Sequence, residues 1–152
     1  MEKSFVKLIA QSIRSNWDYP ALSDYQGATY TYGDIGEHIE KMRLLFEAAG
    51  IKPGDKVAMI GRNSAGWAMT SLGILSYGCV AVPILHEFHP SSVHHIVNHS
   101  ESLAFFVSSS IWENLDMEEM GGLNIILDLN SLKVLHAKKK KLNQENLANQ
   151  LM

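Results

Sequence analysis

One nearly uncharged stretch, from Val57 to Pro83, constrains the fold more than any other part of the chain. A longer segment of apolar and small residues is enclosed by two short apolar runs. These runs are Val57–Ile60 and Cys79–Val82, and Pro83 follows the second. Asn63 and Ser64 can cap the start of a helix, and Gly78 suits the position just after its end. The stretch therefore predicts strand, helix and strand, with the strands as parallel neighbours joined by a right-handed crossover. Because the helix is apolar or small all round, we expect it to be buried on most sides, in the middle of an α/β core.

Periodicity and turn residues predict the elements on either side of this stretch. Before it, we expect a short amphipathic helix over residues 3–15, a hairpin of strands 21–25 and 28–32 around Gln26-Gly27, a helix from Thr31 or Gly33 to about Gly50, and a turn over 51–55. After it, we expect an irregular segment over 84–90, a helix from Ser91 or Ser92 to about His99, a strand over 103–107, a short helix over 111–120 and a last strand over 124–129. Strands that alternate with helices predict an α/β fold: a three-layer, doubly wound, mostly parallel sheet with helices on both faces, plus the small N-terminal β-hairpin.

The end of the chain differs in character from the rest. It carries the lysine run Lys138–Lys141 and a stretch rich in asparagine and glutamine. We therefore expect two parts: a subdomain over residues 1–130 and a tail over 131–152, which is either a loose helix or poorly ordered. A lysine run is most often a solvated face, with contact to an anionic membrane or a nucleotide as the alternative.

Composition limits the classes of function. With 46% hydrophobic and 19% charged residues, the chain has the composition of a globular protein, and its net charge of −3 gives no electrostatic argument for binding nucleic acid. The single cysteine, Cys79, lies in an apolar run, which predicts a small buried side chain and a reducing compartment. The first residues lack the apolar core of a secretory signal, and no apolar run approaches the roughly 20 residues of a membrane span. We expect a cytoplasmic protein. The helix over 3–15 is expected to pack against its own domain, with contact to a membrane surface as the alternative.

The glycine-containing turn Gly61–Gly66 invites comparison with phosphate-binding loops. A phosphate loop requires Lys-Ser/Thr directly after its second glycine, whereas Trp67 and Ala68 stand there. The dinucleotide pattern also fails, because Asn63 takes the place of the glycine that lets backbone approach a pyrophosphate. We therefore interpret these glycines as a turn that permits close helix packing.

Five histidines gather in one region: His86, His89, His94, His95 and His99. His95 and His99 are four residues apart and can share a helical face, as metal ligands do. Neither a cysteine nor a His-Glu-x-x-His pattern accompanies them, so we interpret them as surface or partly satisfied side chains and keep a small metal-binding protein as an alternative. No serine lies in the Gly-x-Ser-x-Gly pattern of a hydrolase.

Several strings, in order, resemble the start of an AMP-forming acyl-CoA synthetase, a member of the adenylate-forming enzyme superfamily. They are Thr29–Asp34 (TYTYGD), Ala49–Ala58 (AGIKPGDKVA), Arg62-Asn63 with Trp67 four residues on, Gly73, and Gly78–Pro83 (GCVAVP). Asn98–Glu101 (NHSE), placed before a Phe-Phe-Val strand, resembles the long-chain fatty acid:CoA ligase branch in particular. The resemblance covers roughly residues 10–110.

The resemblance implies a two-step reaction that uses ATP, Mg²⁺ and coenzyme A. A carboxylate, here that of a fatty acid, attacks the α-phosphate of ATP, and coenzyme A thiolate then displaces AMP from the acyl-adenylate. The negative charge that develops on the transferring phosphate must be stabilised by positioned cations and amides. In this family those groups lie downstream, in a Ser/Thr/Gly-rich loop that ends in lysine and in later segments. Ser108-Ser109-Ser110 is not that loop, because no Gly-Thr-x-Gly-x-Pro-Lys follows it.

We therefore assign no catalytic, cofactor-binding or metal-binding residue within these 152 residues. The resemblance implies an N-terminal fragment of a ligase, inactive alone and completed by downstream subdomains. A stand-alone, non-catalytic assembly or binding module with the same fold is the alternative. Surfaces that would meet the missing subdomains predict association into a dimer or a larger species.

Overall fold

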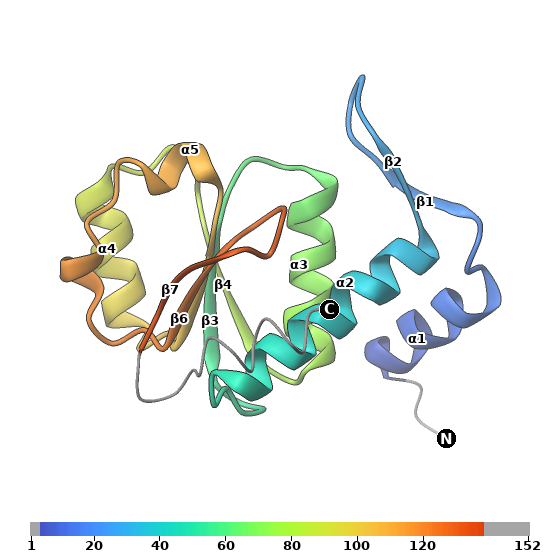
Figure 1. The fold of residues 1–152 in the computed structure, drawn as a ribbon, viewed down its shortest axis with the longest axis horizontal. Coiled ribbons are helices and arrows are strands. Elements are labelled where there is room, and N and C mark those ends of the chain that lie inside the picture. The colour runs from blue at the N-terminus through green and yellow to red at the C-terminus, as the bar shows by residue number, and fades with distance from the viewer. Residues whose placement is uncertain (1–3, 139–152) are drawn as a thin grey trace.

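A five-stranded sheet crosses the middle of the computed structural model, which describes residues 4–138 (Figure 1). In spatial order its strands are β4 (Val80–Ile84), β3 (Lys56–Ile60), β5 (Ala104–Val107), β6 (Ile125–Asp128) and β7 (Val134–Ala137). The first four run parallel, and β7 pairs antiparallel with β6. The mostly parallel α/β sheet predicted from the sequence is confirmed.

Helices cover both faces of this sheet because the central strands are apolar on both sides. Val57 and Met59 of β3 pack with the helices α2 (Tyr32–Ala48) and α3 (Ala65–Ser76). Ala58 and Ile60 point to the opposite face, toward α4 (Pro90–His99), α5 (Ser109–Trp112) and the short 3-10 helix η1 (Met117–Met120). This alternation is the two-residue period of a strand.

The N-terminal elements lie beside this core. Helix α1 (Phe5–Ser15) packs against α2, and the antiparallel hairpin of β1 (Pro20–Ser23) and β2 (Thr29–Thr31) leads directly into α2 (Figure 1). The helix and the small hairpin predicted for this region are both present. Within residues 4–138, no helix has the length and apolar character that crossing a membrane requires.

Side chains fix where the helices begin. Thr31 accepts a hydrogen bond from the backbone N–H of Asp34, and the Asp34 carboxylate accepts one from the backbone N–H of Thr31, which is a capping box. Helix α3 is capped by Ser64, so of the two predicted caps Asn63 is not used. Helix α4 is capped by His89 rather than by the predicted Ser91 or Ser92, and it starts at Pro90, because proline is well suited to a first helical position.

The second strand of the Val57–Pro83 stretch corrects one expectation. Strand β4 does not stop before Pro83 but continues to Ile84. It lies at the edge of the sheet, beside β3. Val80 donates its backbone N–H to Asp55 O of the neighbouring segment. Because successive residues of a strand direct their backbone groups to opposite sides, the ring nitrogen of Pro83 faces the open edge, where no donor is needed.

The region after β5 differs from its prediction in two places. The single helix expected over 111–120 is two short pieces, α5 and η1, separated by a turn at Glu113-Asn114. The strand β6 is not the last one, because Val134–Ala137 form β7 in the segment expected to be a loose or poorly ordered tail. The expectation for 139–152 lies outside the described residues.

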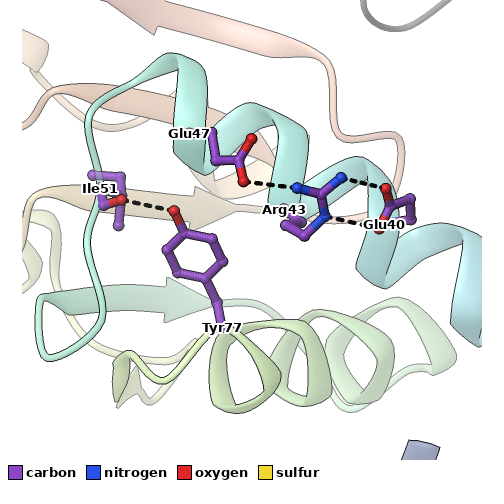
Figure 2. A network of polar contacts seen from close by, with 5 residues as sticks. All are labelled: Glu40, Arg43, Glu47, Ile51 and Tyr77. Carbon is purple, nitrogen blue, oxygen red and sulfur yellow. Dashed lines mark hydrogen bonds and ion pairs between the residues drawn. The ribbon is translucent and has the colours of Figure 1, made fainter.

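The C-terminal ends of α2 and α3 are joined by Tyr77 (Figure 2). Its hydroxyl donates to the Ile51 carbonyl at 2.9 Å, and its ring meets that of Phe46 edge-on with centroids 5.1 Å apart. On the exposed side of α2, Arg43 pairs with the carboxylates of Glu40 and Glu47, which lie one helical turn before and after it. We interpret the charged group as surface support for α2, since exposed ion pairs contribute little to stability.

Candidate functional site

The carboxyl edge of the parallel strands is the place where an α/β sheet of this kind binds ligands. Ligand binding is favoured at the point where the strand order reverses, because the connections that leave the two neighbouring strands there run in opposite directions along the sheet. Here β3 has β4 on one side and β5 on the other, so the reversal lies between β3 and β5. The residues that follow these two strands are Gly61 and Ser108.

Side chains of the protein itself fill this position. A Cβ atom added at Gly61 would collide with the methyl group of Leu129, a residue that is buried just after β6. Leu129 is held there because its backbone N–H donates to Val107 O at 3.0 Å, and Ser108 donates to Ile60 O at 3.2 Å. The crevice between the two strands is therefore packed with apolar atoms rather than open to a nucleotide.

The first turn of α3 finds its hydrogen-bond acceptors within the chain. The backbone N–H of Ala65 donates to the Asp24 carboxylate at 2.8 Å, and that of Trp67 donates to the Ser64 hydroxyl at 3.1 Å. Asn130 packs so closely over Gly66 that any side chain there would meet its Oδ1 atom. The predicted role of Gly66 in close packing is confirmed, and the carboxylate of Asp24 at this helix start would repel a phosphate.

A polar pocket of about 210 Å³ opens beside this packed crevice, between α2, the start of α3 and the loop from β6 to β7. Its lining includes Asp34, His38 and Asn130. The His38 ring makes a hydrogen bond of 3.1 Å to the hydroxyl of Thr70, and that hydroxyl donates to the Leu129 carbonyl at 3.1 Å. These two contacts connect α2, α3 and the β6–β7 loop through a single buried hydroxyl.

The protonation of His38 follows from this arrangement. Thr70 has one hydroxyl proton, which is used on Leu129, so His38 Nε2 must be the donor toward Thr70. Burial lowers the pKa of His38, and the nearby charge of Lys41 acts in the same direction; together they bring it from 6.5 to about 4. The ring is thus neutral near pH 7 and acts as a fixed donor.

Sequence reasoning did not single out His38 or Thr70. A signal was present, because His38 lies three residues after Ile35 and four before Met42, on the buried face of α2. A polar side chain in such a position needs a partner. The partner could not be found from sequence, since Thr70 and Leu129 are 32 and 91 residues away.

The five clustered histidines do not converge on one point. Among the described residues, no group of three or more histidine, cysteine, aspartate or glutamate side chains is placed to hold a metal ion. His94 accepts a hydrogen bond from the backbone N–H of Asp116, and His89 caps α4. His95 and His99 share one face of α4 with their rings stacked, as their spacing predicted.

The single cysteine has the environment of a packing residue. Cys79 is buried and its thiol lies 3.5 Å from the Lys52 carbonyl oxygen. Burial raises the pKa of the Cys79 thiol to about 11, so the reactive thiolate is scarce at neutral pH. The predicted role as a small buried side chain is confirmed. Of the run Lys138–Lys141, only Lys138 lies within the described residues.

A family model described as AMP-binding enzyme matches residues 9–150. Among curated proteins, the chain is 25% identical over 99 residues to surfactin synthase subunit 2 of Bacillus subtilis (strain 168), an alignment that covers 65% of this chain and 3% of that protein. It is 35% identical over 81 residues to a crotonobetaine/carnitine–CoA ligase of Proteus mirabilis (strain HI4320), covering 53% of this chain and 15% of the ligase. The chain therefore spans a small part of the length of these relatives.

A solved structure shares the fold. The R395G mutant of coronafacic acid ligase from Pectobacterium brasiliense superposes with a TM-score of 0.78 at 18% sequence identity, covering 95% of this chain and 29% of the ligase chain. At this identity the likeness concerns the fold alone.

Proposed function

This chain belongs to the AMP-binding enzyme family, and we propose on that premise that it is the N-terminal part of an ATP-dependent, AMP-forming ligase that joins a carboxylic acid to a thiol. The family match over residues 9–150 carries the proposal. In the proposed reaction, the acid attacks the α-phosphate of ATP with loss of pyrophosphate, and the thiol then displaces AMP to give a thioester. The whole protein would use ATP, Mg²⁺ and coenzyme A.

A fatty acid is the acid we propose, with coenzyme A as the thiol. Support for the fatty acid comes from the sequence Asn98–Glu101 before β5, which resembles the long-chain fatty acid:CoA ligase branch. Support for the thiol comes from the 35% identity to a protein named as a CoA ligase. The similarity to a surfactin synthase subunit makes a different acid the main competitor, and it is tested below.

The packed carboxyl edge of the sheet supports a scaffold role for this part of the enzyme. Leu129 fills the crevice at Gly61, and Asp24 and Ser64 accept from the first amides of α3. Charge that develops on a transferring phosphate needs cations and free donors, and this edge offers a carboxylate instead. The residues that act on ATP would therefore come from downstream subdomains, and the 152-residue chain would be inactive alone.

Exchange between ATP and labelled pyrophosphate, driven by a carboxylic acid, tests the proposal. We expect no acid-dependent exchange with the isolated chain, and exchange with the protein encoded by the complete reading frame. A panel of fatty acids of different lengths, amino acids and carnitine identifies the acid. Exchange by the isolated chain would contradict the scaffold role, and preference for an amino acid would contradict the fatty acid.

A non-catalytic assembly module with the same fold is a second candidate. The observation that favours it is the same packed edge, because the sheet fills its own ligand crevice without side chains from another domain. Reading the gene past Met152 distinguishes the two candidates. Continuation into a Ser/Thr/Gly-rich loop that ends in lysine supports the ligase, and a stop codon supports the module. A cytoplasmic location stays a prediction for either.

A further inference from the structure

The outer face of helix α4 carries two histidines that are free to bind. Val93 and Val97 form the buried side of α4, whereas His95 and His99 lie on its exposed side. Their ring centroids are 5.6 Å apart and the rings are nearly parallel, at 16°. Residues four apart on a helix are neighbours, so both imidazoles occupy one patch of surface.

These two rings are available, unlike their neighbours in sequence. In the part of the chain that the structure describes, neither the His95 nor the His99 side chain makes a hydrogen bond or an ion pair. By contrast, His94 accepts from the backbone of Asp116, His89 bonds to Ser91, and His86 lies 3.8 Å from the Glu87 carboxylate. Both nitrogen atoms of each ring in the pair can therefore turn toward a ligand.

Their position on the helix favours a cation. His99 is the last residue of α4, where the unpaired carbonyl groups of a helix give partial negative charge. Imidazole nitrogen is a preferred ligand of Cu²⁺, Ni²⁺ and Zn²⁺, and affinities for these ions usually rank Cu²⁺ above the other two. Two histidines at this spacing on one helical face are a known way to hold such an ion.

We propose that His95 and His99 form a two-histidine surface site for a divalent transition metal ion, with Cu²⁺ bound more tightly than Zn²⁺. Exposure lets the two rings rotate from their stacked arrangement until one nitrogen of each contacts the ion at about 2.0–2.1 Å. No third histidine, cysteine or carboxylate among the described residues joins them, so water completes the coordination. This site does not depend on the ligase proposal, which rests on the family match.

Calorimetric titration of the 152-residue chain with Cu²⁺ and with Zn²⁺ tests the site. We expect one ion per chain and tighter binding of Cu²⁺ than of Zn²⁺. His95→Gln and His99→Gln should each lower the affinity at least about tenfold, since even indirect partners of a metal ligand are worth that much. His86→Gln, which removes a histidine outside the helix, should leave the affinity unchanged.

Electron paramagnetic resonance of the Cu²⁺ form provides a second measurement, with two imidazole nitrogens expected in wild type and one in either α4 variant. Circular dichroism checks that the variants stay folded. The proposal is overturned if wild type binds neither ion, if both α4 variants bind as tightly as wild type, or if His86→Gln weakens binding equally.

Discussion

The Thr70 hydroxyl carries two buried hydrogen bonds at once. Thr70→Val keeps the shape but leaves the His38 donor and the Leu129 carbonyl without a partner. We expect it to lower the free energy of unfolding by about 1–3 kcal/mol. Thr70→Ser keeps the hydroxyl and loses one methyl group, which costs about 1 kcal/mol. Urea unfolding compares the two, and equal stability of the valine variant and wild type would contradict the paired hydrogen bonds.

His38 makes stability depend on pH. Its pKa is about 4 in the folded protein against 6.5 for an ordinary imidazole, so between these values the unfolded chain binds a proton that the folded chain does not. Stability is therefore fully present above pH 6.5 and falls as the pH drops toward 4. We expect a loss of about 2 kcal/mol between pH 7 and pH 5.

The variant His38→Gln isolates this contribution, because carboxylates also titrate at the acidic end of the range. The difference in unfolding free energy between wild type and His38→Gln should shrink as the pH falls from 7 to 5. A constant difference over this range would mean that His38 titrates normally in the folded protein.

The residues whose role could be predicted from the sequence alone are those that act on their neighbours in the chain. Ser64 and Gly78 follow from capping rules, and Cys79 follows from its apolar neighbours. Asp24, Thr70 and Asn130 could not be predicted, because each acts on a residue more than 40 positions away in the chain. Nothing in the local pattern specifies such a partner.

At the scale of elements, the loop after β6 is packed onto the loop after β3. Gly61→Ala would force the buried Leu129 to move, and we expect a loss of about 1–3 kcal/mol in unfolding free energy. Gly121→Ala is the matched control, because its backbone has an ordinary φ of −66° and no atom lies within 4 Å of the added methyl group. Guanidinium unfolding should show a change within about 0.5 kcal/mol for the control. Equal effects of the two substitutions would contradict the packing at Gly61.

The elements predicted correctly are the ones with strong periodicity or clear caps. Helices α1, α2 and α3 and the strands β3, β5 and β6 appear within a few residues of their expected bounds. The extension of β4 through Pro83 was missed because proline was read as the end of the strand. Proline is tolerated in an edge strand, and the sequence does not show that β4 lies at the edge of the sheet. Strand β7 was missed because Leu135 also fits one face of the loose helix expected for the tail, together with Leu132, Leu142, Leu147 and Leu151. Only the pairing with β6 decides between strand and helix at Val134–Ala137.

At the scale of the whole molecule, large apolar side chains are exposed along β4 and the loop that follows it. Val80 is 49% exposed, Leu85 65% and Phe88 42%. We expect the 152-residue chain to self-associate through this surface, because exposed apolar area drives association. Sedimentation velocity over a range of concentrations measures it.

The double substitution Leu85→Ser and Phe88→Ser should shift the protein toward monomer. Tyr25→Ser provides the control, because Tyr25 is also highly exposed but lies at the turn between β1 and β2. A wild-type protein that is strictly monomeric at every concentration would contradict the expected association.

Pro83 has a consequence for how this sheet can grow. One residue before the end of the outer strand β4, the ring of Pro83 stands where the next strand would need a hydrogen-bond donor. A stray segment from another molecule, laid along that side, would meet a gap in the ladder and gain little. Pro83 thus disfavours fibre formation through the same edge that bears the exposed apolar residues. These residues can be exposed there without further strands adding to the sheet.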